Sequence, residues 1–225
     1  MPGRCFNTEC ELVQVLRDSM PAMIEGTRPR FLAEVKVSGG VPDLLVVWPD
    51  FDSLRKRIRK VGPNTLESLT EIRIVMALYT ARPLRITTIA SWVGVSQREA
   101  SRALGRLSEL GFARETATGS FLREEWAVPH LRYAISVEAK LFKWRDALAQ
   151  ASRNLLFSDQ AYVAMDAAYA NRAFAHLDAF RRANVGLAAV DLDGNIMVKH
   201  RPRTRRSDRP NLFRWIVSEA LVQSL

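Results

Sequence analysis

Two apolar segments with the composition of buried strands lie at either end of a long stretch with helical periodicity. The first is Val41–Trp48 and the second is Leu131–Lys140. A nearly continuous run of aliphatic and β-branched residues is typical of a strand that is buried on both faces of a sheet. Because such a sheet needs helices to cover it, we expect an α/β protein.

Further elements are expected outside the helical stretch. Thr8 and Glu11 have the spacing of a capping box, and apolar residues then repeat at helical intervals. Runs of β-branched residues around Ser38-Gly39-Gly40 predict a β-hairpin, and Asp193-Gly194 predicts another. Residues 50–63 are polar and basic, and we interpret them as a linker. The expected helices are 9–24, 142–157, 171–183 and 212–225, and the expected strands are 31–37, 41–48, 131–140, 162–165, 185–192 and 195–200.

The middle stretch has the order helix, helix, tight turn, helix and β-hairpin, with helices expected at 65–80, 87–93 and 97–110. Gly94-Val95 forms the turn, and Ser96 is a favourable N-cap for the third helix. The segments Ile89-Ala-Ser-Trp-Val-Gly-Val-Ser-Gln97 and Leu107-Ser-Glu-Leu-Gly-Phe112 carry this pattern. The stretch resembles winged helix-turn-helix domains.

That resemblance implies that the third helix contacts DNA. The face opposite its apolar stripe carries side chains that hydrogen-bond to base edges or phosphates, namely Gln97, Arg98, Ser101, Arg102 and Arg106. Domains of this kind also serve as protein–protein modules, so a structural or dimerising role is the alternative.

The basic surplus is concentrated near the C-terminus. The chain has 33 Lys and Arg residues against 24 Asp and Glu residues, a formal net charge of +9. Of the basic residues 27 are Arg. This excess of Arg over Lys reflects either codon preference or a polyanionic partner, since Arg pairs bidentately with phosphate. The net charge is +2 over residues 1–63, +1 over 64–130 and +6 over 131–225. The run Lys199–Arg209 is either a solvated loop or a surface that contacts nucleic acid. For the second case, the candidate phosphate ligands are Arg203, Arg205 and Arg206.

Three ionisable residues lie within the two strand-like segments. Asp43 opens the first, and Glu138 and Lys140 share one face of the second. Charged groups at a sheet surface are costly unless they coordinate something. Two carboxylates and an amine suit phosphodiester hydrolysis, in which Asp43 and Glu138 bind Mg²⁺ or Mn²⁺ and Lys140 orients the attacking water or stabilises developing charge.

Pro42-Asp43 and Glu138-Ala139-Lys140, together with the order of the surrounding elements, resemble the PD-(D/E)XK nuclease superfamily. The resemblance implies an α/β fold with a mixed-sheet restriction-endonuclease-like core flanked by helices. Gln150 matches an amide that supports the active site in branches of that superfamily. Asp43 and Glu138 stand 95 residues apart, farther than is usual in the family. An inserted winged helix at 64–126, within a discontinuous core of 1–63 and 127–225, explains that spacing.

Each candidate also has a structural alternative. Asp43 could cap a turn, Glu138 and Lys140 could be a surface pair, and Gln150 could make a structural hydrogen bond. Glu34 and Glu11 are weaker candidates for a second acidic ligand. The three histidines, His130, His176 and His200, share no ligand spacing.

The sequence thus predicts a Mg²⁺-dependent DNA endonuclease or nuclease-like DNA-binding protein, with Asp43, Glu138 and Lys140 hydrolysing phosphodiester bonds and Gln150 supporting them. The alternatives are a transcriptional regulator built on a catalytically silent nuclease-like scaffold and, less favoured, a protein-interaction module. We expect DNA as the partner and no membrane, and a homodimer is compatible with two-fold DNA sites. The absence of an apolar signal sequence and the two cysteines favour the cytoplasm.

Overall fold

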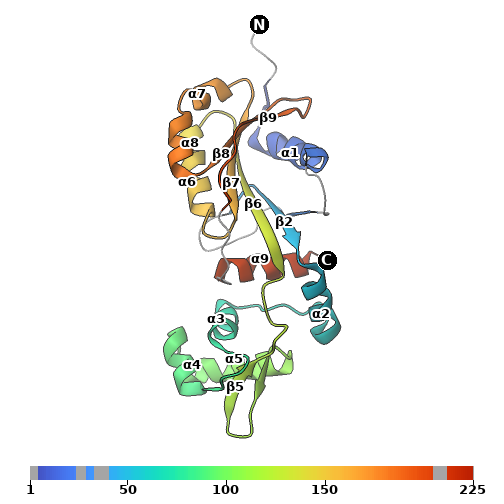
Figure 1. Cartoon of the computed structure of the whole chain (residues 1–225), viewed down its shortest axis with the longest axis vertical. Coiled ribbons are helices and arrows are strands. Elements are labelled where there is room, and N and C mark those ends of the chain that lie inside the picture. Colours follow the sequence, from blue (N-terminus) through green and yellow to red (C-terminus); the bar gives the residue numbers. More distant parts are fainter. Residues whose placement is uncertain (1–4, 24–28, 33–40, 205–211, 225) are drawn as a thin grey trace. The chain divides into compact units, whose positions relative to one another are not determined.

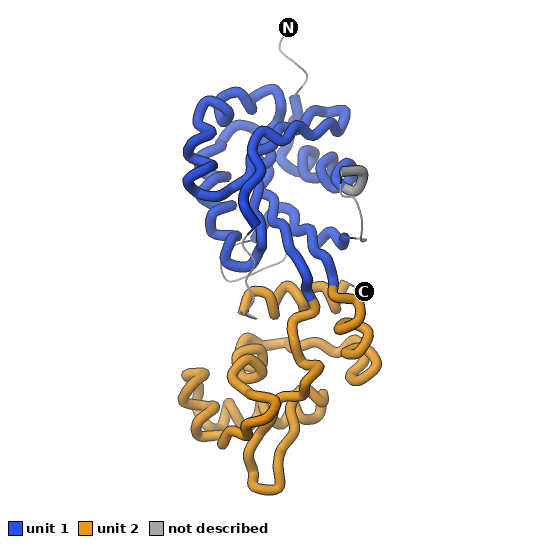
Figure 2. The backbone as a smooth tube through the Cα atoms, viewed as in Figure 1, with its two compact units in different colours: residues 1–49, 131–208 blue, residues 50–130, 209–225 orange. Residues whose placement is uncertain are grey.

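The computed structural model describes residues 5–23, 29–32, 41–204 and 212–224. The chain divides into two compact units, each built from two segments (Figure 2). Unit 1 comprises residues 1–49 and 131–208, and unit 2 comprises residues 50–130 and 209–225. The two units are described separately below.

Unit 1 is built on a six-stranded mixed sheet (Figure 1). The pairs β1–β2, β2–β6 and β8–β9 are antiparallel, whereas β6–β7 and β7–β8 are parallel. In spatial order the strands are β1 (Arg30–Leu32), β2 (Leu44–Pro49), β6 (Leu131–Lys140), β7 (Gln160–Asp166), β8 (Gly186–Val190) and β9 (Ile196–His200). The expected mixed α/β sheet is therefore confirmed, and the strand expected at 131–140 has those bounds.

Helices cover both faces of this sheet (Figure 1). One face packs against α1 (Glu9–Met23), and the other packs against α6 (Trp144–Asn154), α7 (Ala170–Phe174) and α8 (Leu177–Ala183). Val137 and Ala139 of β6 belong to the core beneath α1. Because successive strand residues point to opposite faces, Glu138 between them points toward the α6 side.

The helices of unit 1 begin and end where local chemistry dictates. Thr8 Oγ1 accepts a hydrogen bond from Glu11 N at 3.1 Å, and the Glu11 carboxylate accepts one from Asn7 N at 2.8 Å, so these side chains cap α1. The single helix expected at 171–183 is two short helices, α7 and α8, with a break around His176.

Unit 2 contains five helices within the described residues and a three-stranded sheet of order β3-β5-β4. The helices are α2 (Phe51–Val61), α3 (Leu69–Ala77), α4 (Ile86–Val93), α5 (Gln97–Glu109) and α9 (Leu212–Gln223), and the strands are β3 (Leu84–Arg85), β4 (Ala113–Glu115) and β5 (Ser120–Arg123). Its core joins the apolar faces of α3, α4 and α5 to Phe112 and Trp215, both fully buried. The core of unit 2 thus contains residues from both of its segments, 50–130 and 209–225.

The linker expected at 50–63 is wrong, because most of this stretch is helix α2. Asp50 caps the helix through Ser53 N, and Arg57 is fully buried in a bidentate pair with Glu219 of α9, with both oxygens at 2.6 Å. As a result α2 and α9 belong to unit 2. The observed divisions fall after residues 49, 130 and 208, whereas the sequence placed them after 63 and 126.

The first helix of the middle stretch also begins later than expected. Ser68 and Glu71 form a reciprocal capping box, so α3 starts at Leu69 rather than near residue 65. Its C-terminal end precedes Leu78, whose extended backbone leads away from the helix.

No helix in the described ranges is both long enough and apolar enough to cross a bilayer. Cys5 and Cys10 are exposed free thiols.

Candidate functional site

The register between β2 and β6 brings Asp43 beside Glu138. Leu44 pairs with Val137 across the antiparallel strands, so Asp43, the residue before β2, lies opposite Glu138. The Ala139 amide donates a hydrogen bond to Asp43 Oδ2 at 2.8 Å, which holds this carboxylate at the sheet surface. Two residues that stand 95 positions apart in the sequence are therefore neighbours.

Lys140 completes a charged cluster at the same end of β6. Its Nζ lies 3.6 Å from Asp43 Oδ2 and 2.7 Å from Oε2 of Glu9, in the first turn of α1. Burial alone lowers the pKa of the Lys140 amine, but the Glu9 hydrogen bond and the carboxylates of Asp43 and Glu138 raise it above its usual value. Lys140 is thus held as an ammonium. We call Glu9, Asp43, Glu138 and Lys140 the carboxylate–lysine cluster.

Glu138 is the most buried member of this cluster, with 3% of its surface exposed. Burial, followed by the Asp43 carboxylate, raises the pKa of Glu138 to about 7. A hydrogen bond from Asn154 Nδ2 to Glu138 Oε1 at 2.6 Å, and the charge of Lys140, act in the opposite direction. Near neutral pH this carboxyl group is therefore poised between its protonated and ionised forms.

The amide that contacts Glu138 comes from Asn154, one helical turn beyond Gln150. No hydrogen bond joins Gln150 to the cluster within the described residues, and its buried Oε1 has no partner there. Residues four apart lie on the same face of a helix, so the sequence located the right helix and proposed a different amide. The structure assigns the supporting contact to Asn154.

The cluster offers carboxylate oxygens, which are the ligand atoms that a hard divalent cation prefers. The carboxyl groups of Asp43 and Glu138 lie close enough to interact, and they repel each other when both are ionised. Mg²⁺ is often held by one or two carboxylates, with waters and substrate phosphate oxygens filling its octahedral shell. Among the described residues no group of three or more His, Cys, Asp or Glu side chains is arranged to hold a metal. Asp43 and Glu138 therefore fit a cation that depends on waters and phosphate for its remaining ligands.

Glu9 is the member of the cluster that sequence reasoning missed. Glu11 was the candidate on this helix, but it caps the N-terminus of α1. Both acids lie in the first turn, and no local signal distinguishes them. Glu34 lies outside the described residues.

The histidines take no part in this cluster. His130 is fully buried in unit 2, where burial and the nearby Arg57 lower its pKa to about 4, opposed by Asp50. Its Nδ1 lies 2.7 Å from Ser53 Oγ. This environment is that of a structural, neutral histidine.

The proposed DNA-contacting face of α5 is exposed at four of its five positions: Gln97, Arg98, Ser101 and Arg102. Arg106 differs, because its guanidinium lies 2.7 Å from Glu67 Oε2 and 3.0 Å from Glu71 Oε1. These ion pairs tie α5 to the start of α3, and we assign Arg106 a structural role.

Of the C-terminal arginines, Arg203 is exposed, and its backbone exchanges two hydrogen bonds with the Asn184 side chain at 2.8 and 2.9 Å. Arg205 and Arg206 lie outside the described residues.

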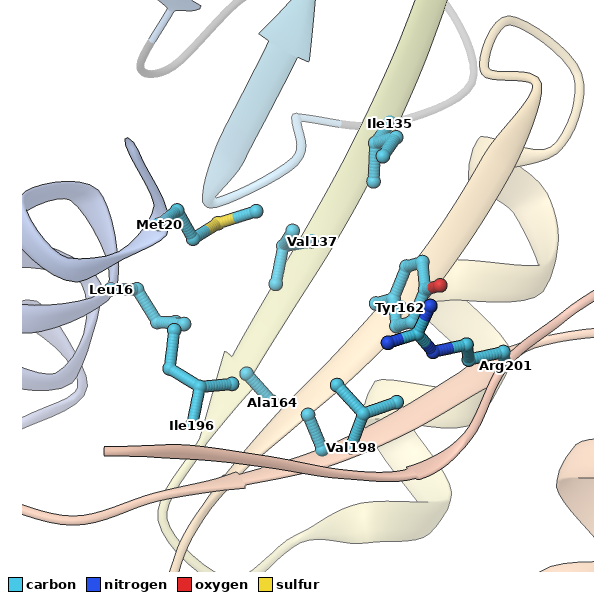
Figure 3. A pocket seen from close by; sticks show the side chains of 10 residues that line it. Leu16, Met20, Ile135, Val137, Tyr162, Ala164, Ile196, Val198 and Arg201 are labelled. Atoms are coloured by element: carbon cyan, nitrogen blue, oxygen red, sulfur yellow. The ribbon is translucent and has the colours of Figure 1, made fainter. Parts of the chain in front are cut away.

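A separate pocket of about 220 Å³ opens between α1 and the sheet (Figure 3). Its lining is mostly aliphatic, with Tyr162 and Arg201 as the polar members. The pocket uses Ile135 and Val137 of β6, which point to the opposite face from Glu138. No described member of the lining belongs to the carboxylate–lysine cluster, so the pocket and the cluster are distinct features.

Comparison of the chain with protein-family models, with curated proteins and with solved structures yields no match.

Proposed function

We propose that this chain is a Mg²⁺- or Mn²⁺-dependent DNA endonuclease whose hydrolytic site is the carboxylate–lysine cluster. The observation that carries the proposal is the convergence of Asp43, Glu138 and Lys140 at one end of β6. A buried carboxyl group whose pKa is raised by burial and by a neighbouring carboxylate, as that of Glu138 is, is a costly arrangement that is typical of functional sites.

The order of the elements supports a PD-(D/E)XK type of core. A helix, an antiparallel pair bearing Asp43 and Glu138, a crossover helix and a parallel strand follow one another as α1, β2, β6, α6 and β7. In this assignment residues 50–130 of unit 2 are the insertion between the two halves of the core, and residues 209–225 of unit 2 follow the second half.

In the proposed reaction Asp43 and Glu138 hold the cation, which supplies charge neutralisation at the phosphate and a more acidic water. The Lys140 ammonium donates hydrogen bonds to the attacking water or to the developing phosphorane oxygens. Asn154 orients Glu138, and Glu9 positions the Lys140 amine.

Unit 2 is proposed to be a winged helix-turn-helix domain that places the DNA. Its support is the succession α3, α4, α5 and a β4–β5 hairpin, together with the turn at Gly94. Gly94 has φ 76°, a left-handed conformation that glycine adopts at little cost. The exposed Gln97, Arg98, Ser101 and Arg102 are the side chains available to the major groove.

The proposal is tested by incubating supercoiled plasmid with the full chain and Mg²⁺ or Mn²⁺. Asp43→Asn and Lys140→Met should each slow cleavage by roughly a hundredfold or more, because each removes a group required in the transition state. The matched controls are Asp146→Asn and Lys143→Met, which change an exposed carboxylate and an exposed lysine at the start of α6. Equal cleavage by all five proteins would overturn the catalytic assignment.

A second candidate function is transcriptional regulation on a catalytically silent scaffold. It is favoured by the lack of a third metal-type ligand at the cluster within the described residues and by the exposed polar row on α5. Tight, sequence-specific DNA binding without cleavage in Mg²⁺ and Mn²⁺ would establish this function in place of the nuclease.

A further inference from the structure

Unit 2 carries an exposed aromatic pair that its fold does not require. Tyr79, just after α3, and Trp92, in the last turn of α4, are 48% and 56% exposed. Their ring centroids are 6.4 Å apart and their planes meet at 83°, so the two rings stand nearly perpendicular to each other and form a corner. Large exposed aromatics of this kind mark binding surfaces more often than they stabilise a fold.

The corner belongs to a pocket of about 300 Å³ that also has cationic and donor groups in its lining. Besides Tyr79 and Trp92, the pocket is lined by Met76, Arg123 and Trp215. Arg123 makes no ion pair with any described residue, and its Nε is buried without an acceptor. The Trp215 indole nitrogen, on a fully buried side chain, likewise has no acceptor among the described residues. A buried donor without an acceptor is unfavourable, and a ligand rich in acceptors would satisfy both of these donors.

A second hollow, polar and basic, shares Arg123 with this pocket. Four cationic side chains and two carboxylates line this hollow. The cations are those of Lys56, Lys60, Arg114 and Arg123, and the carboxylates are those of Glu124 and Glu125. Arg114 is paired with Glu124 at 3.5 Å, so Lys56 and Lys60 are the cations most available for an anion. Arg123 therefore lines both the pocket that contains Tyr79 and Trp92 and the basic hollow.

We propose that the Tyr79–Trp92 pocket takes an unpaired base of a DNA strand, with the adjoining phosphates over the hollow lined by Lys56 and Lys60. Every base has a π-face that stacks on an aromatic ring, and its ring nitrogens and carbonyl oxygens are acceptors for Arg123 and Trp215. The inference rests on the proposed function in that the ligand is DNA. It narrows the substrate to DNA that contains unpaired nucleotides, such as a branch, bubble or flap.

The test is the affinity of the full chain for fluorescently labelled oligonucleotides in EDTA, where no cleavage occurs. The probes are an oligothymidylate strand, a duplex of the same length and thymidine monophosphate as a competitor. Trp92→Leu and Tyr79→Leu keep an apolar side chain but remove the stacking face. Phe142→Leu, at a phenylalanine of unit 1 that is 52% exposed, is the matched control.

We expect Trp92→Leu to weaken binding of the single strand by about tenfold, the loss typical of one stacked base, and to leave duplex binding unchanged. Phe142→Leu should match the wild type with both probes. Unchanged single-strand affinity in Trp92→Leu would overturn the inference. An equal loss on the duplex would do so too, and so would competition by the mononucleotide as effective as by the strand, which would indicate a free-nucleotide site.

The outcome is separable from that of the cleavage test. Single-strand binding is measured in EDTA, without the cation that the carboxylate–lysine cluster would hold, and no residue of that cluster lines the pocket. Loss of cleavage with intact stacking, or the reverse, therefore identifies which of the two proposals has failed.

Discussion

Glu138 shows how a single residue couples the stability of this protein to its proposed chemistry. It is nearly fully buried, it faces the Asp43 carboxylate, and its pKa is raised to about 7 against an ordinary value of 4.5. A carboxyl group whose pKa is higher in the folded state stabilises the fold when protonated. Its contribution is complete below pH 4.5 and is lost as the pH rises through 7.

The first prediction follows from that sign. In EDTA, the free energy of unfolding of the wild type should fall between pH 5 and pH 8 by about 2–4 kcal/mol more than that of Glu138→Gln, which cannot ionise. Urea unfolding followed by circular dichroism at the two pH values measures the difference. Parallel pH profiles for the two proteins would show that Glu138 is not perturbed by folding.

His130 has the opposite linkage in unit 2. Its pKa is about 4 in the fold against an ordinary 6.5, so the unfolded chain binds the proton more readily. The stability that comes from neutral His130 is complete above pH 6.5 and is lost as the pH falls towards 4. We expect the urea midpoint of the wild type to drop over this range and that of His130→Asn to drop less. An equal drop in both would assign the acid sensitivity to other groups.

At the scale of elements, the decisive contact is the one that brings α2 and α9 into unit 2. Arg57 and Glu219 form a buried bidentate pair, and Glu219 Oε2 also accepts a hydrogen bond from Leu66 N at 2.8 Å. This pair fixes a helix from each of the two segments that make up unit 2. It anchors α2, the basic stretch that we interpreted as a linker, in the core of unit 2.

Removing one partner of this pair leaves a buried charge without compensation. Arg57→Met should therefore lower the free energy of unfolding by about 3–5 kcal/mol. Adding Glu219→Gln, which keeps an acceptor for Leu66 but removes the charge, should recover part of that loss. A double-mutant cycle by urea unfolding measures the coupling. Additive effects would show that the two side chains act independently.

At the scale of the whole molecule, the charge distribution predicts which part of the chain would contact the phosphates of the proposed DNA substrate. The net charge is +6 over residues 131–225 and only +1 over 64–130, and Arg106 is engaged in ion pairs within unit 2. Each phosphate contact contributes about one unit to the slope of log affinity against log salt. Replacing Arg203, Arg205 and Arg206 together should thus reduce the slope more than replacing Arg98 and Arg102.

Salt titrations of duplex binding in EDTA measure these slopes for the wild type and the two variants. A larger loss of slope in the variant lacking Arg98 and Arg102 would place the main backbone contacts on α5 instead. The comparison is independent of whether the cluster cleaves DNA.

Much of the fold was accessible from the sequence where pattern and local chemistry agree. The strand at 131–140 and the helix that follows Ser96 were predicted from apolar runs, caps and turns, and the mixed sheet was expected from the resemblance to a known superfamily. Helix α2 was missed although Phe51, Leu54 and Ile58 recur in it at helical spacing, because the linker interpretation gave more weight to its polar and basic composition. A buried arginine looks like a surface residue until its partner, here 162 positions away, is known.

The sequence by itself determined the kinds of residue at the candidate site, with Asp43, Glu138 and Lys140 in strand-like segments where packing does not explain a charge. Only the tertiary structure decided which neighbours complete it. The register of β2 against β6 places Asp43 beside Glu138, and the docking of α1 and α6 selects Glu9 over Glu11 and Asn154 over Gln150. The reason is physical: periodicity specifies which face of an element is buried, whereas register and helix phase, which set the contacts, come from packing across the whole core.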